Sequence, residues 1–320
     1  MKQLKWIIVS SLVAFATSCS GTPPVVDTTP PTIISTVPAN NATGVVAATT
    51  IVVTFSEPMN KLVTQSAYQS ASPRLTPPVV QFTWDATGTV LTVTPNLALA
   101  ISNGSDPDPA VTVANTFSYQ ITNVATDLAG NALVTASSTF KTQRRITQDL
   151  PILASLTGEV RADGSTSACT PLCVGDSGTA ANAQYKGFVS FDLTNIPVGV
   201  QSFEFANLSA SQTSLFGNPY GTLGGIITLD QVNFAALDLA SAFNIGTPIR
   251  TLGSLSTTAA IEVKTLSVLP AIQDDYAQRV PRGNRTQYRL TFGTPASFNS
   301  TLDAAGFSET PVLNVRYFLP

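Results

Sequence analysis

The sequence predicts an all-β protein built from two β-sandwich domains. Strand-like runs bounded by Gly, Pro and Asn recur along its 320 residues, and 22 Pro and 20 Gly favour short strands and turns over helices. A chain of this length suits about two domains of roughly 100–200 residues each. Because 43% of the residues are hydrophobic, each domain can form a real core.

The composition also excludes several functions. The chain has no histidine, so Ser-His-Asp or Cys-His catalysis and His-ligated zinc are ruled out. Its 16 Lys+Arg against 19 Asp+Glu lack the basic excess with which nucleic-acid-binding proteins neutralise phosphates. We therefore expect a protein that is not an enzyme and does not bind nucleic acid.

The amino terminus has the pattern of a signal peptide. Lys2 and Lys5 precede an apolar run from Trp6 to Ala16, which is too short for a membrane span of about 20 residues. The following Ala16-Thr17-Ser18-Cys19 resembles the bacterial lipoprotein box, which implies that residues 1–18 are removed and that Cys19 is acylated. Ordinary cleavage near Cys19 is the alternative. Ser20, and not Asp, follows the cysteine, which resembles lipoproteins sorted to the outer membrane, so we expect a secreted protein anchored at the bacterial outer membrane or cell surface.

Residues 19–31 are rich in proline and threonine and show no apolar periodicity. Proline-rich chain favours an extended conformation of about 3.1 Å per residue. This segment is therefore predicted to be a tether between the lipid anchor and the first domain.

The first domain is predicted over residues 32–143. Apolar residues at alternate positions, as in Ile51, Val53 and Phe55, are typical of strands with one buried face. The predicted strands are Thr32–Val37, Val45–Phe55, Val79–Trp84, Thr89–Thr94, Phe117–Val124 and Val134–Lys141. Asp106 and Asp108 lie in a non-periodic insertion from about Ser102 to Asn115, which we expect to be weakly constrained.

The order of short motifs in this segment is more specific than the number of strands. Pro38-Ala39-Asn40-Asn41, Thr54-Phe55-Ser56-Glu57-Pro58 and Asp127-Leu128-Ala129-Gly130-Asn131 follow one another along it. This arrangement resembles the bacterial Ig-like domain first described in S-layer proteins, the SbsA type. The resemblance implies a non-catalytic sandwich that serves as a spacer or adhesion module. Glu57, Asp127 and Asn131 carry oxygen donors that suit calcium, although we favour a turn-forming role for them.

The second domain is predicted over residues 146–320, after a polar junction at Gln143-Arg144-Arg145. Leu269, Ile272 and Tyr276 have helical spacing and predict one short helix. The predicted strands are Ile152–Ala162, Tyr185–Leu193, Ser202–Gln212, Gly225–Asn233, Ala259–Leu266, Arg285–Phe292 and Val312–Leu319, with one more near Thr247–Ser254.

Three runs in this domain occur in the order of a known family. Val174-Gly175-Asp176 leads to Lys186-Gly187-Phe188-Val189-Ser190-Phe191-Asp192-Leu193, and Pro311–Tyr317 closes the chain. The order is similar to that of DNRLRE-type, carbohydrate-binding-like domains, and the resemblance implies a C-terminal jelly roll. The tryptophans usual in the middle of that family are absent here.

Cys169 and Cys173 lie close together in a loop rich in Gly and Ser. In an exported protein the pair is predicted to form a disulfide, which would fix the loop conformation. A metal site is the alternative, but the pair lacks the other two soft ligands that zinc requires.

Arginines are dense between Arg279 and Arg289. Strand alternation places Arg285, Gln287 and Arg289 on one face, and it places Arg316 on the corresponding face of the last strand. If the two faces adjoin, they form a surface for an acidic glycan or carboxylates, because guanidinium groups bind such oxygens in pairs. A solvated sheet face is the alternative.

Four acidic residues of the second domain are candidates for a structural calcium ion, which jelly rolls of the resembled family often carry. These are Glu159, Asp163, Asp192 and Asp303. Their separation gives no motif, so the expected protein has no cofactor other than this candidate ion.

Taken together, the sequence predicts a tethered surface lipoprotein that acts in adhesion or envelope scaffolding. Its expected partners are the membrane, through the lipid anchor, and a surface glycan or polymer bound by the second domain. The alternatives are a structural protein partner in an S-layer or other envelope complex, and a polysaccharide-active enzyme.

Overall fold

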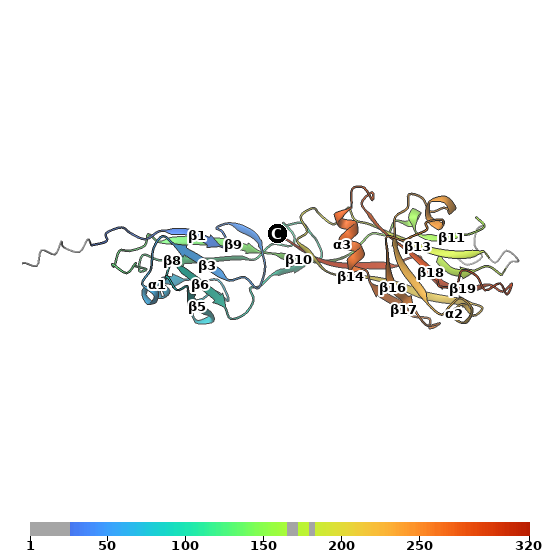
Figure 1. Cartoon of the computed structure of the whole chain (residues 1–320), viewed down its shortest axis with the longest axis horizontal. Helices are drawn as coiled ribbons and strands as arrows, with labels where there is room; N and C mark the ends of the chain where they lie inside the picture. Colours follow the sequence, from blue (N-terminus) through green and yellow to red (C-terminus); the bar gives the residue numbers. More distant parts are fainter. Residues whose placement is uncertain (1–25, 165–171, 179–182) are drawn as a thin grey trace, which may run out of the picture.

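The computed structural model describes residues 26–164, 172–178 and 183–320, which form an elongated molecule (Figure 1). The first domain lies at one end and the second at the other, and the carboxyl terminus lies between them (Figure 1). The predicted signal peptide, Cys19 and most of the tether lie outside the described residues. The all-β fold class predicted from the sequence is confirmed.

The first domain is a sandwich of two four-stranded sheets. One sheet has the order β1 (Ile33–Val37), β3 (Ile51–Phe55), β6 (Val90–Pro95) and β5 (Val80–Trp84). The other has the order β2 (Ala42–Val45), β9 (Ala136–Thr142), β8 (Thr116–Ile121) and β4 (Tyr68–Gln69). A helix, α1 (Lys61–Ala67), and a 3-10 turn, η1 (Pro77–Val79), connect strands.

Alternation along the strands builds the core of this sandwich. Ile51, Val53 and Phe55 point inward from β3, and Leu91 and Val93 point inward from β6. Both sheets also contribute rings to the core, which are listed here as contacting pairs: Phe55 and Trp84, Tyr68 and Phe82, Tyr68 and Tyr119, Phe117 and Phe140. Such pairs favour a single packing arrangement because ring contacts prefer stacked or edge-on geometry.

The second domain contains the strands of a twelve-stranded sheet, to which the first domain adds β7 (Ser102–Gly104). Along its main path the order is β16 (Arg250–Ser256), β15 (Ile227–Val232), β18 (Arg285–Phe292), β13 (Gln184–Asp192), β12 (Leu172–Asp176), β19 (Asp303–Phe307), β14 (Ser202–Phe216), β20 (Val312–Leu319), β10 (Arg144–Asp149) and β7. β11 (Gly158–Arg161) pairs with β13, and β17 (Val263–Ser267) pairs with β14. The remaining elements are η2 (Ala154–Leu156), α2 (Pro219–Thr222), the π-helical turn η3 (Leu239–Phe243) and α3 (Leu269–Ala277).

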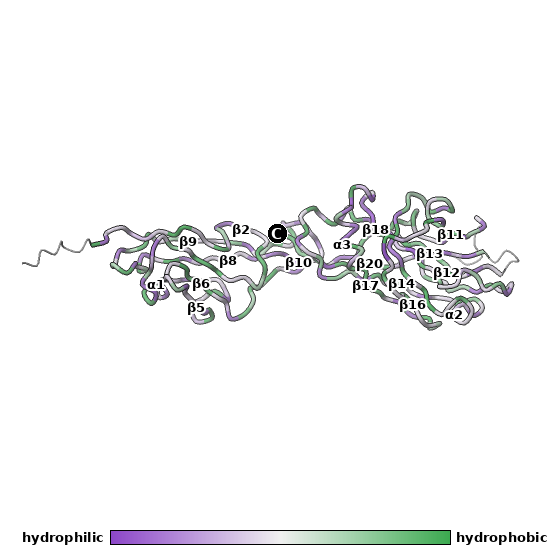
Figure 2. Tube along the Cα trace, viewed as in Figure 1, coloured by the Kyte–Doolittle hydropathy of each residue, from purple (hydrophilic) through white to green (hydrophobic). Residues whose placement is uncertain are grey.

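One apolar core joins both ends of this sheet. β14 is 15 residues long, and it pairs with β20 along its first half and with β19 along its second. Leu208 of β14, Leu290 of β18 and Val315 of β20 all belong to the same buried cluster, so the sheet folds over on itself. Hydrophilic and hydrophobic residues are mixed along the chain in both domains (Figure 2). The jelly-roll identity of this domain stays a prediction.

The predicted helix is confirmed as α3. Pro270 occupies its first turn, where proline loses no helical hydrogen bond. Ala271 and Ile272 are buried, while Leu269 and Tyr276 pack against the main core. The helical spacing of Leu269, Ile272 and Tyr276 therefore correctly predicted a helix with one buried side.

The polar junction between the domains is a structured contact, and the insertion around Asp106, expected to be weakly constrained, takes part in it. β7 belongs to the insertion and pairs in parallel with β10, the first strand of the second domain. The buried Arg144 guanidinium donates to the carbonyls of Pro320 at 2.8 Å and Pro107 at 2.8 Å, and to that of Thr112 at 3.3 Å. This contact could not be predicted from the sequence, because a strand of three residues is too short to show alternation.

A second contact between the domains also lies next to Pro320. The Gln201 side chain donates to the Gly44 carbonyl at 3.0 Å. Gly44 has φ of +67°, and a Cβ atom at this position would lie 2.6 Å from the Gln201 side chain and 3.0 Å from the Pro320 backbone. Glycine is needed here both for its backbone conformation and for the close approach of the two domains. None of the helices in the described part of the chain is long and apolar enough to cross a membrane.

Candidate functional site

The structure buries much of the predicted arginine face. Gln287 and Arg289 are only 1% and 7% exposed, because the segment that contains η3 covers them. Arg289 donates to Asp230 Oδ2 at 2.8 Å and to the Ile245 carbonyl at 2.7 Å. Gln287 accepts from the Phe234 backbone and donates to the Ser190 hydroxyl. The expectation of an exposed binding face is therefore corrected at these two positions.

Arg285 and Arg316 do not complete a common surface either. Four strands lie between β18 and β20 in the sheet, so the two predicted faces do not adjoin. Arg316 is half-buried, donates to the Thr147 hydroxyl at 2.9 Å and lies over the ring of Phe205. Arg285 is half-buried at the start of β18, and its Nε has no hydrogen-bond partner.

The four predicted calcium ligands do not gather into one site in the described part of the chain. Among the described residues, no three of the carboxylates Glu159, Asp163, Asp192 and Asp303 come together as a possible metal site. Glu159 accepts from the Cys173 backbone, and Asp163 lies 3.6 Å from the Arg161 guanidinium. Asp192 accepts from the backbone and hydroxyl of Thr194, both at 2.8 Å. Each carboxylate thus has a local structural contact of its own.

Asp303 instead pairs across the sheet with Asp176, a residue that the sequence analysis did not single out as a site. Asp176 and Asp303 are 0% and 1% exposed and lie opposite each other on β12 and β19. Asp303 accepts from the Asn218 backbone at 2.6 Å and the Asn299 side chain at 2.9 Å. Burial opposes ionisation of Asp303, but these hydrogen bonds prevail and lower its pKa. The pair anchors the ends of the neighbouring loops.

Cys173 is buried in β12 and is disulfide-bonded. Cys169 lies outside the described residues, so the Cys169–Cys173 pairing stays a prediction.

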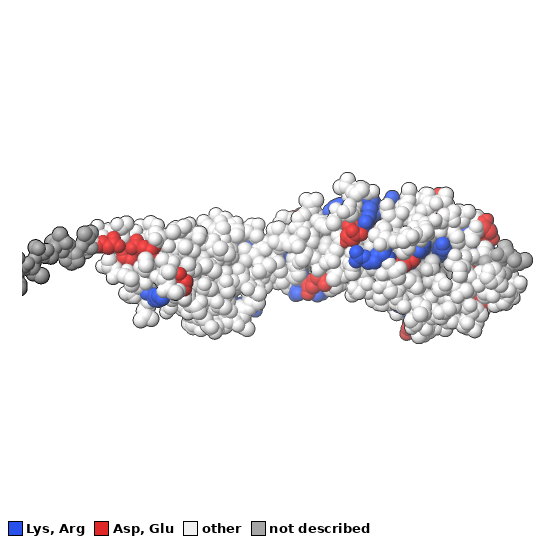
Figure 3. Space-filling model, viewed as in Figure 1, with Lys and Arg blue, Asp and Glu red and all other residues white. Residues whose placement is uncertain are grey.

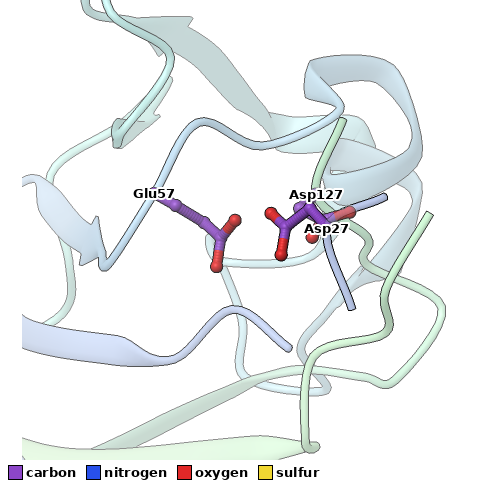
Figure 4. A group of neighbouring side chains, drawn as sticks. All are labelled: Asp27, Glu57 and Asp127. Carbon is purple, nitrogen blue, oxygen red and sulfur yellow. The ribbon is translucent and has the colours of Figure 1, made fainter. Parts of the chain in front are cut away.

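The described residues contain one group of three acidic side chains whose ligand atoms lie within 4.8 Å of one another, namely Asp27, Glu57 and Asp127 (Figure 4). Asp27 precedes β1, Glu57 follows β3, and Asp127 begins the turn that ends at Asn131. The two Asp127 oxygens accept from the backbone and side chain of Asn131, each at 2.8 Å. The Asn131 amide also donates to the Asp27 carbonyl at 3.1 Å. Asp27, predicted as part of the tether, therefore packs on the first domain.

Two carboxyls of this group have shifted pKa values, Glu57 and Asp127. Burial and the nearby charges of Asp27 and Asp127 raise the pKa of Glu57. Burial also opposes ionisation of Asp127, but its hydrogen bonds to Asn131 prevail and lower the pKa of that carboxyl. Oxygen donors of this kind are the ligands that calcium takes, so these are the described residues that can hold a metal ion. Figure 3 shows acidic residues gathered at this end of the first domain on a largely uncharged surface.

A shallow hollow of about 480 Å³ lies beside β4 and β8 of the first domain. Gln69, Ser70, Ser118, Gln120 and Ser137 line it together with Ala71 and Tyr119. The Gln120 amide donates to the Gln69 side chain at 2.7 Å. The hollow is thus an uncharged surface of mixed polar and apolar character.

Comparison with solved structures finds only distant similarity. An L,D-transpeptidase from Mycobacterium smegmatis is 12% identical over 71% of this chain and 75% of its own, with a TM-score of 0.25. The N-terminal part of the bacterial S-layer protein SbsC is 15% identical over 53% of this chain and 43% of its own, also at 0.25. SGBP-B from a xyloglucan utilization locus in Bacteroides uniformis is 10% identical over 91% and 73%, at 0.22. Such scores do not indicate a shared overall fold.

Comparison of the sequence with protein families identifies the first domain more clearly than comparison with solved structures does. No curated protein matches the chain. The family model of the bacterial Ig-like domain, however, matches residues 27–142, which begin at Asp27 of the acidic group and end in β9. This match confirms that the N-terminal segment, residues 27–142, resembles the bacterial Ig-like domain, while the SbsA type stays a prediction.

Proposed function

We propose that this protein is a non-catalytic component of the bacterial cell surface. The Ig-like domain serves as a spacer, and the second domain carries the contact surface for adhesion or envelope scaffolding. The predicted acylation of Cys19 would attach the chain to the membrane, and residues 20–25 would lead to the first domain.

The observation that supports this proposal best is the linear arrangement of the two domains. The first described residues lie at one end of the molecule, and β11, β19 and α2 lie at the other (Figure 1). The paired strands β7 and β10, the Arg144 hydrogen bonds and the Gln201 contact hold the domains in line. A molecule attached by its amino terminus would therefore present the far end of the second domain away from the membrane.

The buried acidic pair supports a role without catalysis. A glycosidase needs two carboxyl groups that face a substrate across a cleft. Asp176 and Asp303 are close together, but both are shielded from solvent and accept hydrogen bonds from neighbouring backbone and side chains. They are therefore suited to fixing loops and not to acting on a sugar.

One observation favours the alternative of a protein partner. β1 is an edge strand of the first sandwich, and it exposes Ile34 and Val37. An uncovered edge strand offers backbone groups to a strand from another chain. In this alternative the first domain would join an envelope complex by sheet extension.

The proposal is tested by expressing the full chain in a diderm bacterium. We expect a palmitate analogue to label the wild-type protein and not Cys19→Ser, and an antibody against the second domain to bind intact cells. An unlabelled protein that stays inside the cells would contradict the proposal. Cross-linking through the β1 edge, lost in Ile34→Lys, would support the protein-partner alternative.

A further inference from the structure

The loop between β18 and β19, residues 293–302, holds an aromatic side chain out in solvent. The Phe298 side chain is 80% exposed. Among the described residues, no other aromatic side chain belongs to the exposed large hydrophobic residues. Its φ of +57° falls in the left-handed region, and Ser300 has φ of +58°. Bulky residues rarely adopt this conformation unless the surrounding structure imposes it, and such positions cluster at functional sites.

The two residues that flank Phe298 are both anchored to the buried acidic pair. The Ser297 backbone and hydroxyl donate to Asp176 Oδ2 at 2.5 and 2.8 Å. On the other side, the Asn299 amide donates to Asp303 Oδ2 at 2.9 Å. The aromatic ring is therefore presented from a fixed loop, which lowers the entropy that binding would cost.

The chemistry around Phe298 is polar and uncharged. Residues 293–302 include Thr294, Ser300 and Thr301 but no Lys, Arg, Asp or Glu. Asn299, Ser300 and Thr301 are exposed. The Asn299 amide contacts Asp303 and the Thr301 backbone, which leaves the Ser300 and Thr301 hydroxyls open to solvent. A protein-binding hot spot of the usual kind needs a broader apolar patch around its anchor. A single ring among hydroxyl and amide groups suits a sugar, because one face of a pyranose ring carries C–H groups and its rim carries hydroxyls.

We propose that residues 293–302 form a saccharide-binding site for a neutral polysaccharide, with the Phe298 ring stacked on one sugar ring. Ser300 and Thr301 hydrogen-bond the hydroxyls of the same or the next sugar. This inference rests on the proposed function, since it names the ligand class that the far end of the second domain would contact.

Binding is tested with the full chain carrying Cys19→Ser and four neutral polysaccharides, namely xylan, galactomannan, mixed-linkage β-glucan and dextran, by affinity electrophoresis and calorimetry. We expect at least one to bind, with the association constant reduced about tenfold or more by Phe298→Ala. Phe298→Tyr retains an aromatic ring and is expected to bind like the wild type. Val280→Ala removes an equally exposed apolar side chain from another loop and serves as the matched control.

Several outcomes would overturn the inference. These are binding to none of the four polymers, binding to the polyanion alginate alone, or equal binding by Phe298→Ala and the wild type. Loss of binding in Gln120→Ala with full binding in Phe298→Ala would move the site to the hollow of the first domain. Unchanged melting temperatures show that the variants are folded. The antibody test on intact cells is independent of sugar binding, so failure of this inference can be told apart from failure of the proposed surface role.

Discussion

The two domains have similar compositions but use charged side chains in different ways. Among the described residues, the first domain buries a single charged side chain, Asp127. The second domain and its junction strand bury eight, which are Arg144, Arg161, Asp176, Asp230, Lys264, Asp275, Arg289 and Asp303. The first domain therefore depends on aromatic and aliphatic packing, while the second uses buried polar networks to fix its loops. In the second domain, charged side chains that the sequence suggests for ligand binding, such as Arg289, are largely buried and stabilise the fold.

The largest expected effect is at the buried ion pair of the second domain. Arg289→Met leaves Asp230 buried without its cation, which we expect to lower the free energy of unfolding by about 3–5 kcal/mol. Arg250→Met, at an exposed position, is expected to change it by less than about 0.5 kcal/mol. Urea unfolding monitored by circular dichroism measures both variants. Equal effects would contradict the structural role of Arg289.

A matched change in the first domain tests its dependence on apolar packing. Leu91→Ala removes a fully buried side chain from β6, and we expect a loss of about 2–5 kcal/mol. Trp84 is the single tryptophan among the described residues, and its fluorescence reports on the first domain. Leu97→Ala, at an exposed position, is the control. A loss no larger than that of the control would show that this core is not packed as described.

The junction is expected to give a smaller effect. Arg144→Met leaves the carbonyls of Pro107, Thr112 and Pro320 without their donor, at a cost of about 1–3 kcal/mol. Arg145→Met, which loses a contact to Asn103 and a long ion pair with Glu204, should cost less. Calorimetric melting checks the order of the two variants, and the reverse order would remove Arg144 from its role at the junction.

The smallest effect is expected at the acidic group of the first domain. The pKa of Glu57 is raised above its ordinary 4.5 in the folded protein, so its contribution to stability is full below pH 4.5 and is lost as the pH rises through the raised pKa. Asp127 acts in the opposite sense, since its pKa is lowered and its contribution is lost as the pH falls. Glu57→Gln should therefore raise the melting temperature at pH 7 by at most about 2 °C and have no effect near pH 3.

Thermal melts from pH 3 to pH 8 measure this difference, with Glu204→Gln as the control. A lower melting temperature of Glu57→Gln at pH 7 would show that the ionised Glu57 is stabilising.

The sequence predicted the elements whose pattern is strong. Alternation in Ile51–Phe55 and Tyr185–Leu193, and the helical spacing around Ile272, correspond to β3, β13 and α3. It did not predict β19, because Asp303-Ala304-Ala305-Gly306-Phe307 consists mostly of small residues and has no alternation. β7 and β12 are too short, or too uniformly buried, for a period of two to be visible.

The candidate site was harder to predict for a different physical reason. Alternation correctly placed Gln287 and Arg289 on the face opposite Tyr288, but it could not show that the segment around η3 covers that face. Likewise, the contact of Asp27 with Glu57 and Asp127 joins residues far apart in the chain. Phe298 lies in a loop without a motif, and only its exposure and its anchoring by Asp176 and Asp303 distinguish it.

The linear arrangement of the two domains is tested most directly by the distance distribution between the two ends of the molecule. Spin labels on Leu128→Cys in the first domain and Phe298→Cys in the second, in the chain carrying Cys19→Ser, report it by double electron–electron resonance. We predict one long, narrow distribution that broadens in Arg144→Met. A short or broad distribution in the protein without the Arg144 change would contradict a pair of domains held in line.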